Sequence, residues 1–168
     1  MQHKVIQKQE NATDCFVCGT ENPLGLKAFF YELENQELAA VFQPQEGHQS
    51  YPERLHGGMA AAILDETIGR AIMILEPGMW GVTMELSLRY RRPVPLNVPL
   101  KVVGRITKNT HRVFEGTGEL LLPDGSVAVT AQGRYLKQPL ERITEQAEQK
   151  EEMMHLVEDP ADPVEIEY

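Results

Sequence analysis

The segment of residues 55–66 combines a pair of glycines with two carboxylates in an otherwise apolar stretch. Gly57 and Gly58 stand where a helix would begin, and glycine lets a ligand approach the free N–H groups of a helix start closely. Those N–H groups and the helix dipole favour an oxygen that carries or develops negative charge. Asp65 lies two turns further along and could act as a base. The segment therefore predicts an active site built on one helix.

The surrounding pattern predicts how this helix is held. Residues 57–75 are apolar almost throughout, so the helix should be buried nearly all round, and Pro77-Gly78 should end it. Residues 82–90 alternate strictly between apolar and polar side chains, as in a strand covered on one face. The other predicted strands are residues 26–33, 37–43, 98–107, 112–122 and 126–136. An antiparallel sheet wrapped around a long central helix, an α+β fold, satisfies both patterns.

Charge and composition limit the function classes. The chain has 168 residues, of which 42% are hydrophobic, and a formal net charge of −9. Residues 139–168 hold ten acidic residues against Arg142 and Lys150, so the rest of the chain is nearly neutral. This balance argues against nucleic acid as a partner. The apolar runs are too short to cross a bilayer, which predicts no membrane partner, and with only two cysteines and no signal segment a cytoplasmic location is expected.

The same pattern predicts the organisation of the chain. We expect one domain over residues 1–138 and an acidic tail over residues 139–168. The tail has helical composition over residues 140–157, and its proline-containing end is expected to be extended or disordered. Residues 1–22 are polar and are expected to be irregular.

Several motifs resemble one known family. The order of the elements, His56-Gly57-Gly58 and the later Asp65 resemble the hotdog-fold acyl-CoA thioesterases, specifically the phenylacetyl-CoA thioesterase-like branch. The resemblance covers about residues 14–137. It includes three further segments of the chain: Cys15-Phe16-Val17-Cys18-Gly19, Asn22-Pro23-Leu24-Gly25-Leu26 and Tyr90-Arg91-Arg92-Pro93-Val94.

The resemblance implies hydrolysis of an acyl-CoA thioester, with coenzyme A as part of the substrate and no separate cofactor. It implies that the Gly57 N–H holds the thioester oxygen and that Asp65 is the general base or nucleophile. Gly58 then allows close packing, and His56 orients the loop. The Thr83 hydroxyl matches the position that orients the water or the carboxylate. Residues in the preceding loop that could contact the thioester are Gln49 and Ser50.

With these roles, the spacing predicts a site shared between two subunits. Gly57 and Asp65 are eight residues apart, about 12 Å along one helix. One aspartate side chain cannot span that distance to the same carbonyl carbon. Asp65 of one subunit must therefore work with Gly57 of another across a two-fold axis, in a homodimer or a dimer of dimers with two equivalent sites per dimer.

Some residues have two interpretations. Thr83 has the same phase as Glu85 and Ser87, opposite the apolar face, so it could be a surface residue that only strand twist or subunit pairing brings to the site. Guanidinium groups suit phosphate oxygens, and the arginines that could bind coenzyme A phosphates, or simply form an exposed strand end, are Arg89, Arg91 and Arg92. Glu66 is expected to pair with a basic residue.

The two cysteines of the chain could bind a metal, and two activities other than hydrolysis are possible for the predicted site. Cys15 and Cys18 form a single C-x-x-C pair that His3 or His48 could complete as a zinc site, but without a second clear pair we expect reduced structural thiols and no metal. A non-catalytic acyl-CoA binding module is the main alternative function. An enoyl-thioester hydratase is disfavoured, because it needs a histidine beside an acid and no separate histidine is present on the helix.

Overall fold

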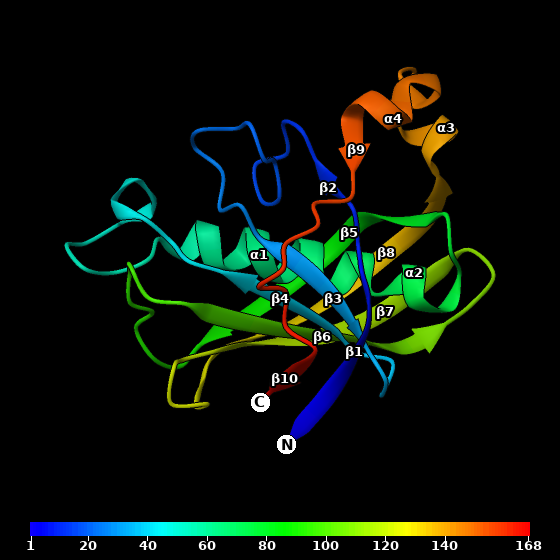
Figure 1. The fold of residues 1–168 in the computed structure, drawn as a ribbon. Helices are drawn as coiled ribbons and strands as arrows, with labels where there is room; N and C mark the ends of the chain where they lie inside the picture. The colour runs from blue at the N-terminus through cyan, green and yellow to red at the C-terminus, as the bar shows by residue number, and fades with distance from the viewer.

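The computed structural model describes residues 1–168, apart from the side chains of residues 151 and 152. Its main element is an antiparallel eight-stranded sheet, in the order β10-β1-β3-β4-β6-β7-β8-β5, that curves around helix α1 (Gly57–Arg70) (Figure 1). The strands of this sheet are β1 (Gln2–Lys8), β3 (Phe29–Leu33), β4 (Leu38–Phe42), β5 (Met79–Tyr90), β6 (Leu100–Asn109), β7 (Val113–Leu121), β8 (Val127–Pro139) and β10 (Glu165–Glu167). The predicted α+β hotdog architecture is confirmed.

The central helix is buried because the sheet approaches it closely. Ile63, Leu64 and Ile68 are fully buried in the core between α1 and the sheet. Gly116 on β7 permits the contact, since a Cβ there would lie 2.6 Å from Ile68 Cγ2. None of the helices in the described part of the chain is long and apolar enough to cross a membrane.

The predicted helix over residues 57–75 is divided in two. α1 ends at Arg70, and a short helix α2 (Ile72–Leu75) continues after Ala71. The Thr67 hydroxyl donates a hydrogen bond of 2.6 Å to the Ile63 carbonyl, one turn back. Such hydrogen bonds to the preceding turn often bend helices, which accounts for a bent helix where the sequence predicts a continuous one.

Strand β5 is the edge of the sheet and contains one irregularity. It pairs only with β8, and the register shifts between Thr83 and Glu85, so that Met84 is an extra, bulged residue. A bulge of this kind reverses the face on which side chains lie. Thr83 therefore lies directly opposite the buried Tyr135, whereas Glu85 lies opposite the exposed Arg134.

Both ends of the chain form strands, the N-terminal one where the sequence predicts irregular structure. Residues 2–8, expected to be irregular, form β1, and residues 165–167, expected to be extended or disordered, form β10, which pairs with β1 (Figure 1). Ile166 is buried against Tyr31 and Leu33. Pairing between segments that are so distant in sequence leaves no local signal, because strand formation depends on the neighbours that cover it.

The acidic tail is only partly helical. Its elements are α3 (Leu140–Ile143), the 3₁₀ turn Ala147–Gln149, α4 (Lys150–Met153) and β9 (Met154–His155), which pairs with β2 (Asn11–Ala12) in a separate two-stranded sheet. The other 3₁₀ turn, Glu46–His48, precedes α1.

The tail is fixed to the sheet by Asp162. Its carboxylate accepts hydrogen bonds from Lys8 Nζ, at 2.6 and 2.8 Å, and from the Tyr31 hydroxyl, at 2.8 Å. Burial alone would raise the pKa of Asp162, but these donors outweigh it and hold the pKa below its usual range.

Replacing Asp162 by Asn is therefore expected to lower the free energy of unfolding by about 1.5–3 kcal/mol at neutral pH, because it removes charge-assisted hydrogen bonds. A lowered carboxyl pKa stabilises the fold above the usual carboxyl range and ceases to do so as the pH falls through the lowered value. Urea denaturation should thus show a difference from the parent that shrinks in acid. Glu158→Gln, at an exposed position of the tail, is the control, and equal loss in both variants would contradict the prediction.

Candidate active site

Asp65 lies half-buried in a cavity between α1 and β5. The Thr83 hydroxyl is 2.9 and 3.0 Å from the two carboxylate oxygens, and the Tyr135 hydroxyl donates to Oδ1 at 3.1 Å. The cavity has a volume of about 310 Å³. Besides Asp65, its lining residues are Ala12, Cys15, Glu66, Gly69, Arg70, Trp80, Gly81, Thr83, Tyr135 and Met154, and we call it the Asp65 cavity.

The groups around Asp65 shift the pKa of its carboxyl group in opposite directions. Burial raises the pKa of Asp65, the hydrogen bonds from Thr83 and Tyr135 lower it, and the nearby charge of Glu66 raises it again; the net pKa is above the usual value. Burial also raises the pKa of Tyr135, which keeps its hydroxyl protonated as a donor. A carboxylate with a raised pKa that is still held in place by two donors is suited to accept a proton.

The bulge at Met84 explains how Thr83 reaches this carboxylate. From its phase with Glu85 and Ser87 the sequence assigns Thr83 to the outer face, with strand twist or subunit pairing as the means of reaching the site. Neither is needed, because the register shift turns Thr83 toward the helix while Glu85 stays outside. Bulges are frequent next to functional sites, where they redirect one side chain.

Tyr135 is the contact of Asp65 that the sequence analysis missed. It lies on the apolar face of β8, is 1% exposed, and stacks on Phe114 with 4.9 Å between ring centroids. A buried tyrosine hydroxyl usually requires a hydrogen-bond partner. The signal was therefore a tyrosine in an apolar strand phase, facing a helix that carries a carboxylate.

Replacing Tyr135 by Phe is expected to raise the pKa of Asp65 further, because one donor to the charged carboxylate is lost. The ring stack on Phe114 is retained, so the free energy of unfolding should fall by only about 0.5–1.5 kcal/mol. NMR titration of the Asp65 carboxyl carbon measures the pKa directly. A pKa unchanged from that of the parent would show that Tyr135 does not stabilise the charged form.

The glycine pair forms the N-terminus of α1, as predicted. The ring of His56 caps the helix, since His56 Nδ1 accepts the Gly58 N–H at 2.9 Å. Within the described part of the chain the N–H of Gly57 has no hydrogen-bond acceptor. The Tyr90 hydroxyl donates to the Gly57 carbonyl at 2.6 Å and ties the helix start to β5. The cap thus uses the amide of Gly58 and leaves that of Gly57 for a ligand.

Gly57 faces a second cavity of about 420 Å³, which we call the Gly57 cavity. Ser50, Arg91 and Arg92 line it as well, and both arginines are exposed. Two predicted contacts are not among the residues lining this cavity. Gln49 forms an isolated bridge with Leu55, and Arg89 pairs with Thr130 beyond the bulge, in phase with the outward Glu85.

The two halves of the predicted site therefore lie in different cavities of this chain. Asp65 and Thr83 line the first, whereas Gly57 lines the second. This is the arrangement that the eight-residue spacing requires of a site completed by a second subunit. Beside these cavities, β5 forms the free edge of the sheet, and its side chains Val82, Met84 and Tyr90 are exposed.

The remaining titratable residues near α1 have structural partners. Glu66 pairs with Arg70 at 2.9 Å, as predicted. The His48 ring accepts the Gln45 N–H and contacts the Leu24 carbonyl, both at 2.9 Å, so it holds the loop before α1. His3 stacks on Tyr168 at the other end of the sheet. Neither histidine is available to the pair of cysteines.

The chain is similar to known thioesterases in both sequence and structure. Residues 53–129 match the model of the thioesterase superfamily. The chain is 30% identical over 98 residues to an uncharacterised protein of Schizosaccharomyces pombe, covering 58% of this chain and 56% of that protein. It is 24% identical over 102 residues to acyl-coenzyme A thioesterase 13 of Mus musculus, covering 61% and 72%. A solved structure described as thioesterase superfamily protein RHA08564 superposes with a TM-score of 0.68 at 30% identity, covering 74% and 60%.

The chain thus spans little more than half the length of the first of these relatives. The matched residues 53–129 include Gly57, Asp65 and Thr83, whereas Tyr135 lies beyond them, as does the Cys15–Cys18 pair. The resemblance to hotdog-fold thioesterases that the sequence motifs indicate is confirmed.

Proposed function

Because residues 53–129 match the thioesterase superfamily and the chain has the hotdog fold, we propose that it hydrolyses an acyl-CoA thioester to the free acid and coenzyme A. The observation that carries the proposal is the half-buried Asp65 carboxylate, held by Thr83 and Tyr135 and raised in pKa. Thioester hydrolysis needs such a group to activate water or to attack the carbonyl carbon itself. Water is the second substrate, so no cofactor is required.

The amide of Gly57 is the proposed stabiliser of the transition state. A thioester carbonyl gains negative charge on its oxygen as the carbon is attacked, and a fixed N–H at a helix start stabilises that charge. Attack gives a tetrahedral intermediate, the C–S bond then breaks, and the coenzyme A thiolate takes up a proton. In the general-base form of the mechanism, Asp65 removes the proton from water and returns it to the sulfur.

The complete site in this proposal belongs to a homodimer. Two β5 edges that pair antiparallel about a two-fold axis would cover Val82 and Met84, and an exposed apolar strand edge is a typical pairing surface. The axis would bring the Gly57 cavity of one protomer to the Asp65 cavity of its partner. Arg91 and Arg92, beside Gly57, would then bind coenzyme A phosphates.

The residues around Asp65 also bear on the two alternative functions, an enoyl-thioester hydratase and a non-catalytic binding module. An enoyl-thioester hydratase would need a histidine near Asp65, but no histidine of the described chain lines the Asp65 cavity, and His56 serves as the helix cap. A binding module would not need the held carboxylate. No observation favours either alternative over hydrolysis.

The test is a thiol-release assay over aryl, short, medium and long acyl-CoAs. We expect free coenzyme A to be released from at least one class and to require Asp65. Calorimetric binding of acyl-CoAs without turnover of any of them would overturn the hydrolase proposal in favour of a binding module. Hydrolysis in ¹⁸O-labelled water under single-turnover conditions tests for a nucleophilic Asp65. Such a residue forms an anhydride with the acyl group, and when water opens the anhydride at the Asp65 carbonyl, the label enters Asp65 and the product carries an unlabelled oxygen.

A further inference from the structure

The turn from Cys15 to Gly19 directs backbone N–H groups onto sulfur. The amides of Val17 and Cys18 donate to Cys15 Sγ at 3.3 and 3.5 Å, and the amide of Ala12 donates to Cys18 Sγ at 3.4 Å. The turn is closed by the Gly19 N–H, which donates to the Cys15 carbonyl at 2.8 Å. A Cβ at Gly19 would lie 2.2 Å from that oxygen, so only glycine fits. Backbone N–H groups therefore hold both sulfurs in fixed positions on one side of the turn, as outer hydrogen bonds do for metal ligands.

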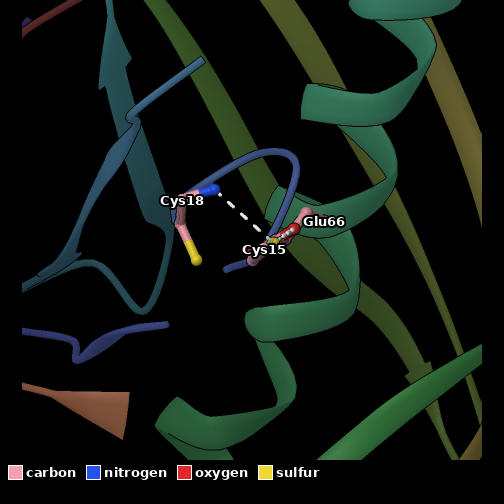
Figure 2. A group of neighbouring side chains, drawn as sticks. All are labelled: Cys15, Cys18 and Glu66. Atoms are coloured by element: carbon pink, nitrogen blue, oxygen red, sulfur yellow. Dashed lines mark hydrogen bonds between the residues drawn. The ribbon is translucent and has the colours of Figure 1, made fainter. Parts of the chain in front are cut away.

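A carboxylate from the central helix completes a group of three side chains that could bind a metal ion. Cys15 Sγ, Cys18 Sγ and an oxygen of Glu66 all lie within 4.8 Å of one another (Figure 2). Without a metal, the Cys15 thiol donates a hydrogen bond of 3.3 Å to Glu66 Oε2. In a tetrahedral zinc site, bond lengths of about 2.3 Å to sulfur and about 2.1 Å to oxygen place ligand atoms about 3.6–3.8 Å apart. The 3.3 Å contact and the 4.8 Å limit on the group lie on either side of that spacing.

Arg70 forms hydrogen bonds to two of these three side chains, Glu66 and Cys18. It is 5% exposed, and it donates from Nε to Glu66 Oε1 at 2.9 Å and from Nη2 to Cys18 Sγ at 3.0 Å. The other carboxylate oxygen, Oε2, is thereby directed at Cys15. Residues that donate hydrogen bonds to metal ligands, without contacting the metal themselves, orient those ligands. The positive charge of Arg70 also offsets the excess negative charge of two thiolates and a carboxylate around a divalent ion.

We propose that Cys15, Cys18 and Glu66 bind a zinc ion. Thiolate ligands select zinc over magnesium and calcium, which prefer oxygen. Cys18 is fully buried, but Cys15 and Glu66 line the Asp65 cavity, so the fourth coordination position opens toward that cavity and takes water. The ion fastens the N-terminal loop to α1 and so builds one wall of the cavity. This differs from the sequence expectation of reduced, metal-free thiols, because folding supplies Glu66 as the third ligand in place of a histidine.

The test measures metal rather than hydrolysis. Full-length protein, purified under reducing conditions, is analysed for zinc by mass spectrometry and titrated with Co²⁺ as a spectroscopic probe. We expect about one ion per chain and a thiolate-to-cobalt charge-transfer band, as for a three-ligand site. Cys15→Ser and Cys18→Ser should lose tight binding. Arg70→Gln should weaken it by about 10–100-fold, since it acts through the ligands.

Matched variants separate this site from the proposed catalysis. Glu66→Gln should lose metal affinity, whereas Asp65→Asn, the neighbouring acid in the same cavity, should keep the full metal content and lose hydrolysis. Zinc should also protect the half-buried thiol of Cys15 from alkylation in the parent. The proposal is overturned if the reduced parent binds zinc and Co²⁺ no more tightly than the double Cys15→Ser, Cys18→Ser variant. That result would leave the hydrolase proposal untouched, because no step of hydrolysis is assigned to the ion.

Discussion

Replacing Asp65 by Asn is expected to lower kcat/KM for acyl-CoA hydrolysis by about 10²–10⁴-fold, the usual contribution of a positioned base. Asparagine has nearly the same shape, and its side-chain oxygen can still accept the hydrogen bonds that Thr83 and Tyr135 donate to Asp65. The loss therefore reports the missing charge rather than a changed cavity. A thiol-release assay on the best acyl-CoA measures it, with Glu145→Gln in the exposed tail as the control for charge.

Stability provides an independent check on the same variant. Burial raises the pKa of Asp65 in the folded state, so the stabilisation associated with this group is present at low pH and is lost as the pH rises through the raised value. At neutral pH the asparagine variant should therefore melt at the same temperature as the parent or higher. Full hydrolytic activity in the correctly folded Asp65→Asn variant would remove Asp65 from the chemistry.

The sequence predicts the parts of this fold that carry a strong local pattern. Residues 57–75 are apolar almost throughout, and Pro77-Gly78 follows them, so a buried helix is the economical interpretation. The strands from β3 to β8 show period-two alternation or turn residues at their ends. β1 and β10 show neither, because they are stabilised by strands distant in sequence: β10 pairs with β1, and β1 pairs with both β10 and β3.

The candidate site is predictable where a residue breaks the local pattern of its element. Gly57 and Asp65 stand out because glycines and carboxylates are unexpected in a buried helix. The partnership of Thr83 and Tyr135 depends on one bulged residue, Met84, which changes the phase of an otherwise regular strand and leaves no mark in the sequence. The same limit applies to Glu66, because its closeness to Cys15 arises from the path of the N-terminal loop across the helix.

Replacing Gly57 by Pro is expected to remove one amide and little else. Proline is favoured at the first position of a helix, and His56, at φ −61° and ψ 134°, already has the backbone conformation that precedes proline. A Cβ at Gly57 would lie at an ordinary 3.5 Å from the Tyr90 ring. Loss of the donor to the developing oxyanion should lower kcat by about 10²–10³-fold. Gly57→Ala, which adds the Cβ but keeps the N–H, should retain most of the activity.

Combining the two defective chains tests whether the site is shared. In a mixed dimer of Gly57→Pro and Asp65→Asn subunits, one site receives both defects and the other receives neither, so the dimer should recover about half of the parent activity. Co-expression with two different tags and purification on both yields the mixed species for the thiol-release assay. If Gly57 and Asp65 of one chain formed a site together, every site in that dimer would carry one defect. Mixed dimers as inactive as the two parent variants would therefore refute a site assembled across the two-fold axis.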